Sequence, residues 1–359
     1  MAKPASKTTS KKAPKKAASS AAPSKKAYAQ AGVDVDLGNA VKSRIQKQVQ
    51  VTHGPEVLGK IGGFGGLFRP DFKGMKEPVL VSSVDGVGTK LKIAFATGRH
   101  DTVGQDLVNH CIDDIAVLGA KPLFFLDYIG AEKLEPAVFE QILRGFSKAC
   151  KAGGCALVGG ETAQMPGMYQ PGEYDLAGTI VGVVDRRKMI DGSRINPGDI
   201  VIGLASNGLH TNGYSLARKV FFDTMGLKVD SKVPGLSKTL GEELLRVHLN
   251  YQPLLASLPE GKVKGMAHIT GGGLIDNLPR VLPDGCDAVI ETKSWKVPAL
   301  FQLIEENGKV DSDEMYQVFN MGIGMTLVVA ERDAAEILRL TKGRAIGRIE
   351  KGAKTVRLA

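Results

Sequence analysis

Residues 79–92 read VLVSSVDGVGTKLK, an apolar run that stops at Asp85 and is followed by a glycine turn and Lys90. An apolar run of this length, bounded by turn residues, predicts a buried strand. Open α/β sheets bind their ligands at the C-terminal ends of strands, which is where Asp85 is expected. Gly86 and Gly88 would let the backbone approach a phosphate, and Lys90 would offer it a positive charge. The stretch therefore predicts a mixed α/β (α+β) fold with a phosphate site at the end of this strand.

A second group of acids lies in residues 103–120, VGQDLVNHCIDDIAVLGA, which read as a helix that is apolar on nearly all sides. Such a helix is expected to be buried. Four polar residues nevertheless lie within it: Asp106, His110, Asp113 and Asp114. Their spacing places them on adjoining parts of one face. Buried carboxylates are costly unless they are paired or bound to a cation, so the helix favours a Mg²⁺-phosphate site. A salt-bridged set on a partly exposed edge is the alternative.

A third acid, Glu161, follows the apolar run that opens ALVGGETAQMPGMY, residues 156–169. A glycine-rich loop, IGGFGGLF, occupies residues 61–68. Three predicted element ends that each deliver an acid are typical of a site for a polyphosphate and its metal ion. We therefore expect Asp85, an acid of the helix and Glu161 to act together.

The second half of the chain carries two further glycine-rich loops. In SNGLHTNGYSL, residues 206–216, His210 and Asn212 precede a predicted helix. In HITGGGLIDNLPR, residues 268–280, three glycines separate His268 from the next predicted helix. Free backbone N–H groups at a helix start bind anions, so these glycines are expected to hold a substrate phosphate. The two histidines are interpreted as acid–base or phosphate contacts, with a core or capping role as the alternative.

The other histidines are interpreted as surface or structural residues: His53, His100 and His248. The sequence has no GxxxxGK[ST], GxGxxG before a helix, HExxH, zinc-type Cys/His spacing or GxSxG, which argues against the standard nucleotide, zinc and hydrolase motifs. Four cysteines without a CxxC pair indicate reduced, structural thiols in the cytoplasm. No apolar run approaches the length of a membrane span.

The charge is concentrated at the N-terminus. The formal net charge is +9, and residues 1–26 contain eight lysines and no acid, which leaves +1 for residues 27–359. A nearly neutral body is not typical of a nucleic-acid-binding domain. The Lys/Ala/Ser/Pro-rich tail is expected to be disordered. It is interpreted as a solubilising extension, with an anionic tether or an organelle transit peptide as alternatives.

Hydrophobic periodicity places alternating strands and helices on both sides of a turn-rich patch, DGSRINPGD, at residues 191–199. The expected strands cover residues 79–84, 123–129, 155–158, 176–184, 200–205, 266–269, 287–291, 323–330 and 345–350. The expected helices cover residues 103–119, 135–152, 213–226, 241–257, 273–281, 297–306 and 332–341, besides an amphipathic run after Tyr28. Three parts are predicted: a tail over residues 1–27, an N-terminal domain over 28–190 and a C-terminal domain over 191–359.

Five motifs together resemble phosphoribosylformylglycinamidine cyclo-ligase, the aminoimidazole ribonucleotide synthetase family of purine biosynthesis: DGVGTK, GGETAQMPGMY, SNGLHTNGYS, HITGGG and FNMGIGM. DGVGTK alone would indicate only the wider ATP-using superfamily, whereas GGETAQMPGMY and HITGGG are specific to the cyclo-ligases. The similarity extends from about Tyr28 to about residue 350. A small-molecule kinase or synthetase of the same superfamily is the alternative, and a non-catalytic nucleotide-binding protein tethered through the tail is a more distant one.

The resemblance implies a two-domain, ATP-using synthetase fold and a homodimer joined through the N-terminal domains, which would also bind ATP and Mg²⁺. It implies ATP-dependent closure of formylglycinamidine ribonucleotide to 5-aminoimidazole ribonucleotide, with release of ADP and phosphate. The implied nucleotide-binding set is Gly62, Gly63, Gly65, Asp85, Gly86, Gly88, Thr89, Lys90, Asp106 and Glu161. The implied substrate-binding set is His210, Asn212, His268, Gly271, Gly272 and Gly273. No membrane and no nucleic-acid partner is expected for the folded body.

The implied metal ligands are Asp85, Asp113, Asp114 and Glu161, and the implied catalytic residues are His210, Lys90 and Asp114. His210 is the expected base for the amidine proton. Where this chain has Asp113, members of the family often carry Asn. A second carboxylate beside Asp114 is expected to raise its neighbour's pKa or to tighten metal binding, so the choice between Asp113 and Asp114 as the ligand stays open here.

Overall fold

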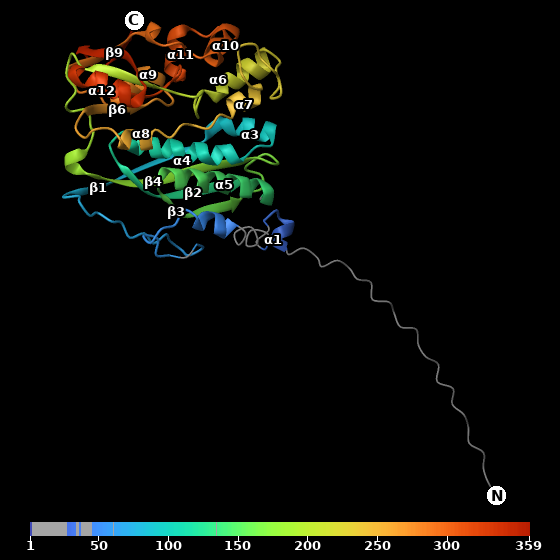
Figure 1. Cartoon of the computed structure of the whole chain (residues 1–359). Coiled ribbons are helices and arrows are strands. Elements are labelled where there is room, and N and C mark those ends of the chain that lie inside the picture. The colour runs from blue at the N-terminus through green and yellow to red at the C-terminus, as the bar shows by residue number, and fades with distance from the viewer. Residues whose placement is uncertain (2–26, 34–35, 37–44, 60, 134) are drawn as a thin grey trace.

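The computed structural model describes residues 1, 27–33, 36, 45–59, 61–133 and 135–359. The predicted tail, apart from its two end residues, lies outside this part of the chain, as does much of the amphipathic run after Tyr28. Figure 1 shows two stacked lobes, one coloured blue to green and the other yellow to red. The fold is of the mixed α/β type that the sequence predicts, with one sheet in each lobe.

The N-terminal lobe is built on a four-stranded sheet in the order β1-β4-β2-β3. Only the β2–β3 pair is parallel. Its elements are β1 (Pro78–Gly86), β2 (Lys121–Ala131), β3 (Ala156–Gln164), β4 (Tyr174–Asp185), α3 (Leu91–Thr97), α4 (Asp101–Ala116) and α5 (Pro136–Gly153). Helices α4 and α5 pack against each other where Gly104 meets Gly145, and a Cβ on either glycine would collide with the other helix's backbone.

The helices cover one face of this sheet, and the opposite face is only partly covered by described residues, as where Phe68 packs against Phe124 of β2. Side chains of β1 alternate between exposed and half-buried along the strand, as the period of two requires. Ser83 and Asp85 point to the helix side, where they contact α4. Leu80 and Val84 point the other way and are 62% and 68% exposed. An apolar sheet face left in solvent suggests a surface that another chain covers.

The C-terminal lobe is built on a six-stranded sheet in the order β10-β7-β9-β5-β8-β6. Its strands are β5 (Ile200–Ala205), β6 (Val263–His268), β7 (Cys286–Ile290), β8 (Ile323–Val329), β9 (Arg344–Lys351) and β10 (Val356–Leu358). Its α-helices are α6 (Tyr214–Arg218), α7 (Leu240–Leu244), α8 (Gln252–Ala256), α9 (Gly273–Asn277), α10 (Ala299–Gly308), α11 (Ser312–Val318) and α12 (Glu331–Thr341). Strand β8 is buried at every position, which explains why it reads as a continuous apolar run.

The single helix predicted over residues 241–257 is wrong. The chain instead forms α7 and α8, separated by an extended segment over residues 245–251. Asn250 accepts the backbone N–H of Gln252, and Pro253 sits in the first turn of α8, so both residues favour a new helix start. In Figure 1 this part of the chain lies beside α4 of the other lobe. Because the helix is interrupted here, backbone N–H groups of this segment are free to donate to the acids of α4 instead of to helix carbonyls.

Two other predicted helices are shorter than expected. Residues 213–226 form α6 followed by a π-helical stretch, Lys219–Thr224, and residues 273–281 form α9 followed by a 3₁₀ turn, Leu278–Arg280. Helices α3 and α11 and strand β10 were not predicted. All four cysteines are buried and free. Within the described residues, no helix combines the length and the low polarity that crossing a bilayer requires.

Candidate active site

The polar centre of the molecule lies where β1, α4 and β6 meet. The Nε2 atom of His110 lies 2.8 Å from Oδ2 of Asp85. Nδ1 of His268 lies 2.9 Å from Oδ1 of Asp114, and Oδ2 of that carboxylate accepts the hydroxyl of Ser83 at 2.9 Å. Two carboxylates are therefore held by imidazoles at the junction of the lobes, with 40% and 25% of the Asp85 and Asp114 side chains exposed.

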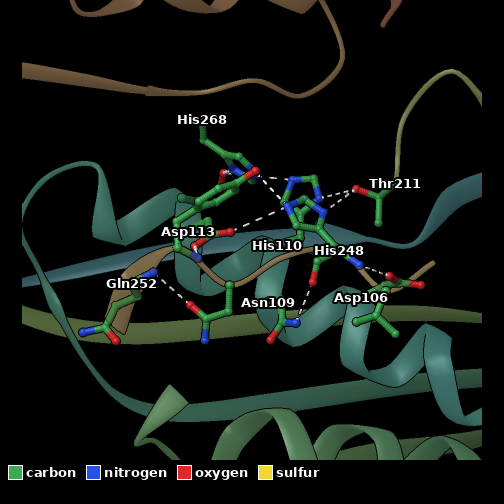
Figure 2. A network of polar contacts seen from close by, with 12 residues as sticks. Asp106, Asn109, His110, Asp113, Thr211, His248, Gln252 and His268 are labelled. Atoms are coloured by element: carbon green, nitrogen blue, oxygen red, sulfur yellow. Dashed lines mark hydrogen bonds and ion pairs between the residues drawn. The ribbon is translucent and has the colours of Figure 1, made fainter. Parts of the chain in front are cut away.

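Thr211 and His248 connect these two ion pairs into one chain of hydrogen bonds (Figure 2). The Thr211 hydroxyl lies 2.7 Å from Nδ1 of His110 and 3.3 Å from Nδ1 of His248. Nε2 of His248 then lies 2.9 Å from Nε2 of His268. The chain thus runs from β1 through both lobes and returns to α4 at Asp114.

If Asp85 and Asp114 are ionised, Nε2 of His110 and Nδ1 of His268 donate to them, because a carboxylate only accepts. The remaining bonds of the chain then require one of the three histidines to be an imidazolium, since the Thr211 hydroxyl can donate in either direction. If His110 carries this charge, its Nδ1 donates to Thr211, Thr211 donates to Nδ1 of His248, and Nε2 of His248 donates to Nε2 of His268. His248 and His268 are then neutral.

The electrostatics agree with this assignment. Burial alone would lower the pKa of His110, but the hydrogen bond to Asp85 and the charges of Asp114 and Asp85 raise it overall. The pKa values of both carboxyls are lowered: burial opposes ionisation, and the hydrogen bonds from His110 and His268 outweigh it. Burial also lowers the pKa of His248 strongly and that of His268 less strongly.

Lys90 does not lie beside a phosphate site in this structure, contrary to the prediction. Its side chain is fully buried, and Nζ donates to Asp106 at 2.9 Å and to the backbone carbonyls of His210 and Arg246 at 2.9 and 2.7 Å. An ammonium group has three donors, and all three are used. From the sequence alone, Lys90 was predicted to contact a phosphate because it follows a glycine turn. Its actual partners come from distant parts of the chain.

Asp106 is likewise structural in this arrangement rather than a nucleotide contact. Its Oδ1 accepts both from Lys90 and from the backbone N–H of His248, at 2.7 Å. The pair joins α4 of one lobe to the extended segment of the other. Burial of an ion pair is tolerated when further hydrogen bonds satisfy both partners, and here backbone groups supply them.

Asp113, one of the predicted metal ligands, faces the protein interior. It is fully buried, and its Oδ1 accepts the backbone N–H of Tyr251 at 2.8 Å. Burial raises its pKa well above the usual range, which favours the neutral form of the carboxyl. Asp114, next in sequence, is ionised and reaches solvent. The geometry therefore favours Asp114 over Asp113 as a cation ligand.

Glu161 lies apart from Asp85 and Asp114 within the chain. Four positions form one row across the sheet, in which each is paired with the next: Asp85, Gly178, Asp127 and Gly160. Glu161 is the next residue along β3, and successive side chains of a strand point to opposite faces. It lies on the open face, about 14 Å from Asp85 at three strand spacings. Within one chain, the structure therefore does not bring the three acids of the predicted site together.

The glycine-rich loop over residues 61–68 lies on the surface. Gly62, Gly63 and Gly65 are exposed, and a Cβ at Gly62 or Gly65 would meet no atom within 4 Å. Phe64 at its tip is fully exposed. The loop approaches β3, where a Cβ on Gly66 would collide with Val158. These positions give the loop room to change its conformation.

The turn after β1 is shaped as predicted. The backbone N–H of Gly86 donates to Oδ1 of Asp85, and Gly88 adopts a positive φ of 68° that favours glycine. Thr89 is exposed, and its hydroxyl lies 3.0 Å from that of Ser215 in the other lobe. The turn therefore contacts the C-terminal lobe.

His210 is placed unusually. Its φ of 61° is rare for a residue other than glycine, and its ring stacks on His248 with centroids 4.1 Å apart. Neither ring nitrogen has a hydrogen-bond partner among the described residues, although the side chain is 1% exposed. Burial lowers its pKa well below the usual range, so the ring is neutral.

The two substrate-side loops predicted from the sequence lie side by side. A Cβ on Gly271 would contact the side-chain oxygen of Asn212 at 3.0 Å. Gly272 has a φ of 101°, and Gly273 approaches the carbonyl of Tyr316 too closely for any side chain. The side-chain amide of Asn277 donates to the carbonyls of Gly271 and Gly273 and holds the loop.

Sequence reasoning missed His248, which it interpreted as surface or structural. The structure places this residue at the centre of the histidine cluster, buried to 1% exposure. The signal lies in LRVHLNYQP, residues 245–253, where asparagine and proline follow the histidine and interrupt a helical pattern. Thr211 was missed as well, because a single threonine in a loop has no diagnostic spacing.

Two family models match this chain, one for each lobe. Residues 72–184 match the model of the AIR synthase related protein, N-terminal domain, and residues 196–358 match the corresponding C-terminal domain. In solved structures, the chain is similar to thiamine-monophosphate kinase from Stenotrophomonas maltophilia (TM-score 0.65, 17% identity, 89% of this chain and 95% of that chain). It is also similar to the hydrogenase maturation protein HypE in complex with ATP (TM-score 0.62, 18% identity, 88% and 90%). At such identities the likeness shows the fold.

Curated relatives are much more similar in sequence. The phosphoribosylformylglycinamidine cyclo-ligase of Citrifermentans bemidjiense is 54% identical over 316 residues, covering 88% of this chain and 91% of that protein. The enzyme of the same name from Bacillus thuringiensis subsp. konkukian is 52% identical over 333 residues, covering 91% and 96%. This agrees with the resemblance of the five motifs, and the chain belongs to the phosphoribosylformylglycinamidine cyclo-ligase family.

Proposed function

We propose that this protein catalyses the ATP-dependent ring closure of formylglycinamidine ribonucleotide to 5-aminoimidazole ribonucleotide, with release of ADP and phosphate. The observation that carries the proposal is identity above 50% with enzymes of that name along nearly the whole chain. The interlobe site supplies the chemistry: ionised carboxylates, a buried neutral imidazole and a glycine loop shaped for a phosphate. We place the reaction in the cytoplasm, for which the four free, buried cysteines are suited.

The reaction must turn a poor leaving group into a good one. Transfer of the γ-phosphoryl group to the formyl oxygen makes that oxygen leave as phosphate when the amidine nitrogen attacks the same carbon. The protein has to hold the nitrogen and carbon near contact distance and keep water from the phosphorylated intermediate. A site at the junction of two lobes, supplied by loops from both, fits these requirements.

His210 is proposed as the base that accepts the amidine proton. Its ring is neutral and its nitrogens are unpartnered within the described part of the chain, and a neutral imidazole is the form that accepts a proton. Its left-handed backbone conformation is a local strain of the kind that persists where function requires it. Replacing His210 by alanine should lower kcat with little change in KM, and full turnover in that variant would remove it from the mechanism.

Mg²⁺ fits the carboxylates of Asp85 and Asp114. Both are ionised, partly exposed and supplied by different elements, and Mg²⁺ binds through one or two carboxylates together with substrate phosphates. Bound there, the ion would neutralise charge on the phosphoryl group in transit. Before it binds, the imidazolium of His110 and the hydrogen bond from the neutral His268 stabilise these carboxylates and keep the site assembled.

The nucleotide and the substrate are proposed to bind at opposite sides of this centre. The exposed loop with Gly62, Gly63 and Gly65 would fold over ATP. The glycines held by Asn277 would receive the ribose phosphate of the substrate, beside Asn212 and His268.

We also propose a homodimer that covers the open face of the N-terminal sheet. Leu80, Val84 and Tyr128 are large apolar or aromatic side chains exposed on this face, and β1 is an edge strand that a second copy can protect. Changing Val84 to Glu should shift the mass measured by sedimentation from dimer towards monomer. A monomeric wild-type protein at micromolar concentration would contradict the dimer.

The proposed activity is tested by ADP release with ATP and Mg²⁺, with and without formylglycinamidine ribonucleotide, together with mass detection of the product. Substrate-dependent ADP and a product lighter by the mass of water are expected. ADP with a stably phosphorylated product would instead indicate a kinase. Absence of substrate-dependent ADP in a folded sample that binds nucleotide would contradict catalysis altogether.

A further inference from the structure

His110, Asp114 and His268 present three metal-ligand atoms to one point at the junction of the lobes. The first two lie one turn apart on α4, and the third ends β6. Oδ1 of Asp114 is 2.9 Å from Nδ1 of His268 and 4.0 Å from Nε2 of His110, and all three ligand atoms lie within 4.8 Å of one another. Ligands bound at about 2.0–2.1 Å lie roughly 2.9–3.4 Å apart. The three atoms need to move by less than about 1 Å to bind a common ion.

The far side of each ligand is already held by a second group. Nδ1 of His110 contacts the Thr211 hydroxyl at 2.7 Å, and Nε2 of His268 contacts Nε2 of His248 at 2.9 Å. The outer oxygen of Asp114 accepts from Ser83 at 2.9 Å. Metal-binding histidines and carboxylates are oriented in this way in protein metal sites.

The ligand set selects the class of ion. Two imidazoles and one carboxylate suit borderline transition metals such as Zn²⁺ and Co²⁺, whereas Mg²⁺ prefers oxygen ligands alone. Three protein ligands leave coordination positions open. Oδ2 of Asp85, 2.8 Å from Nε2 of His110, is next to such a position.

We infer that His110, Asp114 and His268 form a binding site for a Zn²⁺-class ion that bridges the two lobes. Binding removes the Nε2 proton of His110, and the tautomers of His268 and His248 reverse so that Nδ1 of His268 is free to bind. If the protein has the proposed function, the bound ion competes with Mg²⁺ for the Asp114 carboxylate and thereby inhibits turnover. The inhibition rests on that proposed function, and the binding site does not.

The binding is tested by titrating the full-length, metal-free protein with Co²⁺ and following its visible absorption, then displacing it with Zn²⁺. One equivalent of Co²⁺ should bind to the wild-type chain. His268→Ala should abolish the Co²⁺ spectrum at the same metal concentration. Thr211→Val, which removes only an outer contact, should weaken binding about 10-fold to 100-fold and keeps the measurement informative if the histidine variant unfolds.

His53→Ala is the matched control, because this histidine lies outside the cluster and contacts only the Leu157 carbonyl among the described residues. It should bind Co²⁺ as the wild type does, and an equal loss in this variant would overturn the site. Asp113→Asn separates the inferred site from a neighbouring group of Asp113, His248 and His268. If that substitution abolishes binding and Asp114→Asn does not, the ion lies at the neighbouring group.

Activity provides the second readout. Micromolar Zn²⁺ should inhibit substrate-dependent ADP release, and excess Mg²⁺ should relieve the inhibition. Co²⁺ binding without any turnover of the metal-free enzyme would overturn the proposed function and leave the site standing. Full turnover with no Co²⁺ bound would overturn the site and leave the proposed function standing.

Discussion

Helix α4 carries two pairs of polar residues that look alike in sequence and differ in the structure. Asp106 and Asp113 are fully buried and accept backbone N–H groups from the extended segment over residues 245–251. His110 and Asp114 contact Asp85 and His268 at the junction of the lobes. The first pair fastens the two lobes together, and the second forms the centre of the site. A carboxylate in a buried helix is therefore no sign of catalysis until its partners are known.

The physical difference lies in what satisfies each carboxyl. Asp106 is neutralised by Lys90, and at Asp113 burial favours the neutral carboxyl, which avoids the cost of a buried charge. Asp85 and Asp114 are ionised, with imidazole partners and some contact with water. Only carboxylates of the second kind can exchange their partner for a cation without leaving a buried charge behind.

The largest expected effect comes from removing the positive charge between the lobes. Lys90→Met leaves Asp106 as an uncompensated buried carboxylate, which should cost about 3–5 kcal/mol of unfolding free energy. Urea unfolding followed by circular dichroism measures it. Lys92→Met is the matched control: its ion pair with Glu173 is 40% exposed at the lysine and should contribute less than about 1 kcal/mol. Equal losses in the two variants would contradict the structural role of Lys90.

A smaller effect is expected at Asp127, a carboxyl in the same row of the sheet as Asp85. Burial and the nearby Glu161 charge raise its pKa to about 7. The folded state therefore binds more protons than the unfolded state between about pH 4 and pH 7, and the stabilisation present below pH 4 is lost as the pH rises through 7. Asp127→Asn should stabilise the protein by about 2 kcal/mol at about pH 8, since partial exposure reduces the full shift.

The check on Asp127 is a comparison of wild type and variant by thermal unfolding at two pH values. At about pH 4 the two unfolding temperatures should nearly coincide, because both side chains are neutral there. A difference that is independent of pH would mean that Asp127 does not titrate in this range.

The smallest effect concerns the separation of Glu161 from the interlobe carboxylates. Asp85 and Asp114 share the His110 side chain, so substituting both with Asn should give a coupling free energy of about 1 kcal/mol in kcat/KM. Asp85→Asn and Glu161→Gln lie on opposite faces of the sheet, and their effects should add within about 0.5 kcal/mol. Strong coupling of the latter pair would restore a single three-acid site.

The sequence predicted the strands and most of the helices of both lobes, because β1, β4 and β8 and helices α4 and α5 have clear apolar patterns. It also predicted that the turn after β1, α4 and the loops at residues 206–216 and 268–273 would supply the site. What it did not predict depends on contacts between distant segments. The partners of Lys90 lie 16, 120 and 156 residues away, and no local pattern encodes them.

The division of the acids could not be predicted for the same reason. Glu161 was expected beside Asp85 because both end apolar runs, but the strand order and the bulge in the β2–β3 register decide the face on which each side chain lies. The place of His248 in the site follows from the interruption of the predicted helix over residues 241–257, which the sequence analysis did not predict. Residue types indicated the chemistry, and the topology determined which residues perform it.

The most direct test of this account compares two neighbouring residues, Asp113 and Asp114, by kcat/KM for ring closure. Asp113→Asn replaces a buried carboxyl, whose raised pKa favours the neutral form, with a group of the same shape that still accepts from the Tyr251 N–H, and activity should stay within a few-fold of wild type. Asp114→Asn removes an ionised ligand, and activity should fall by about 10²–10³-fold while the unfolding temperature is nearly unchanged. A large loss of activity in Asp113→Asn, with Asp114→Asn active, would contradict the account.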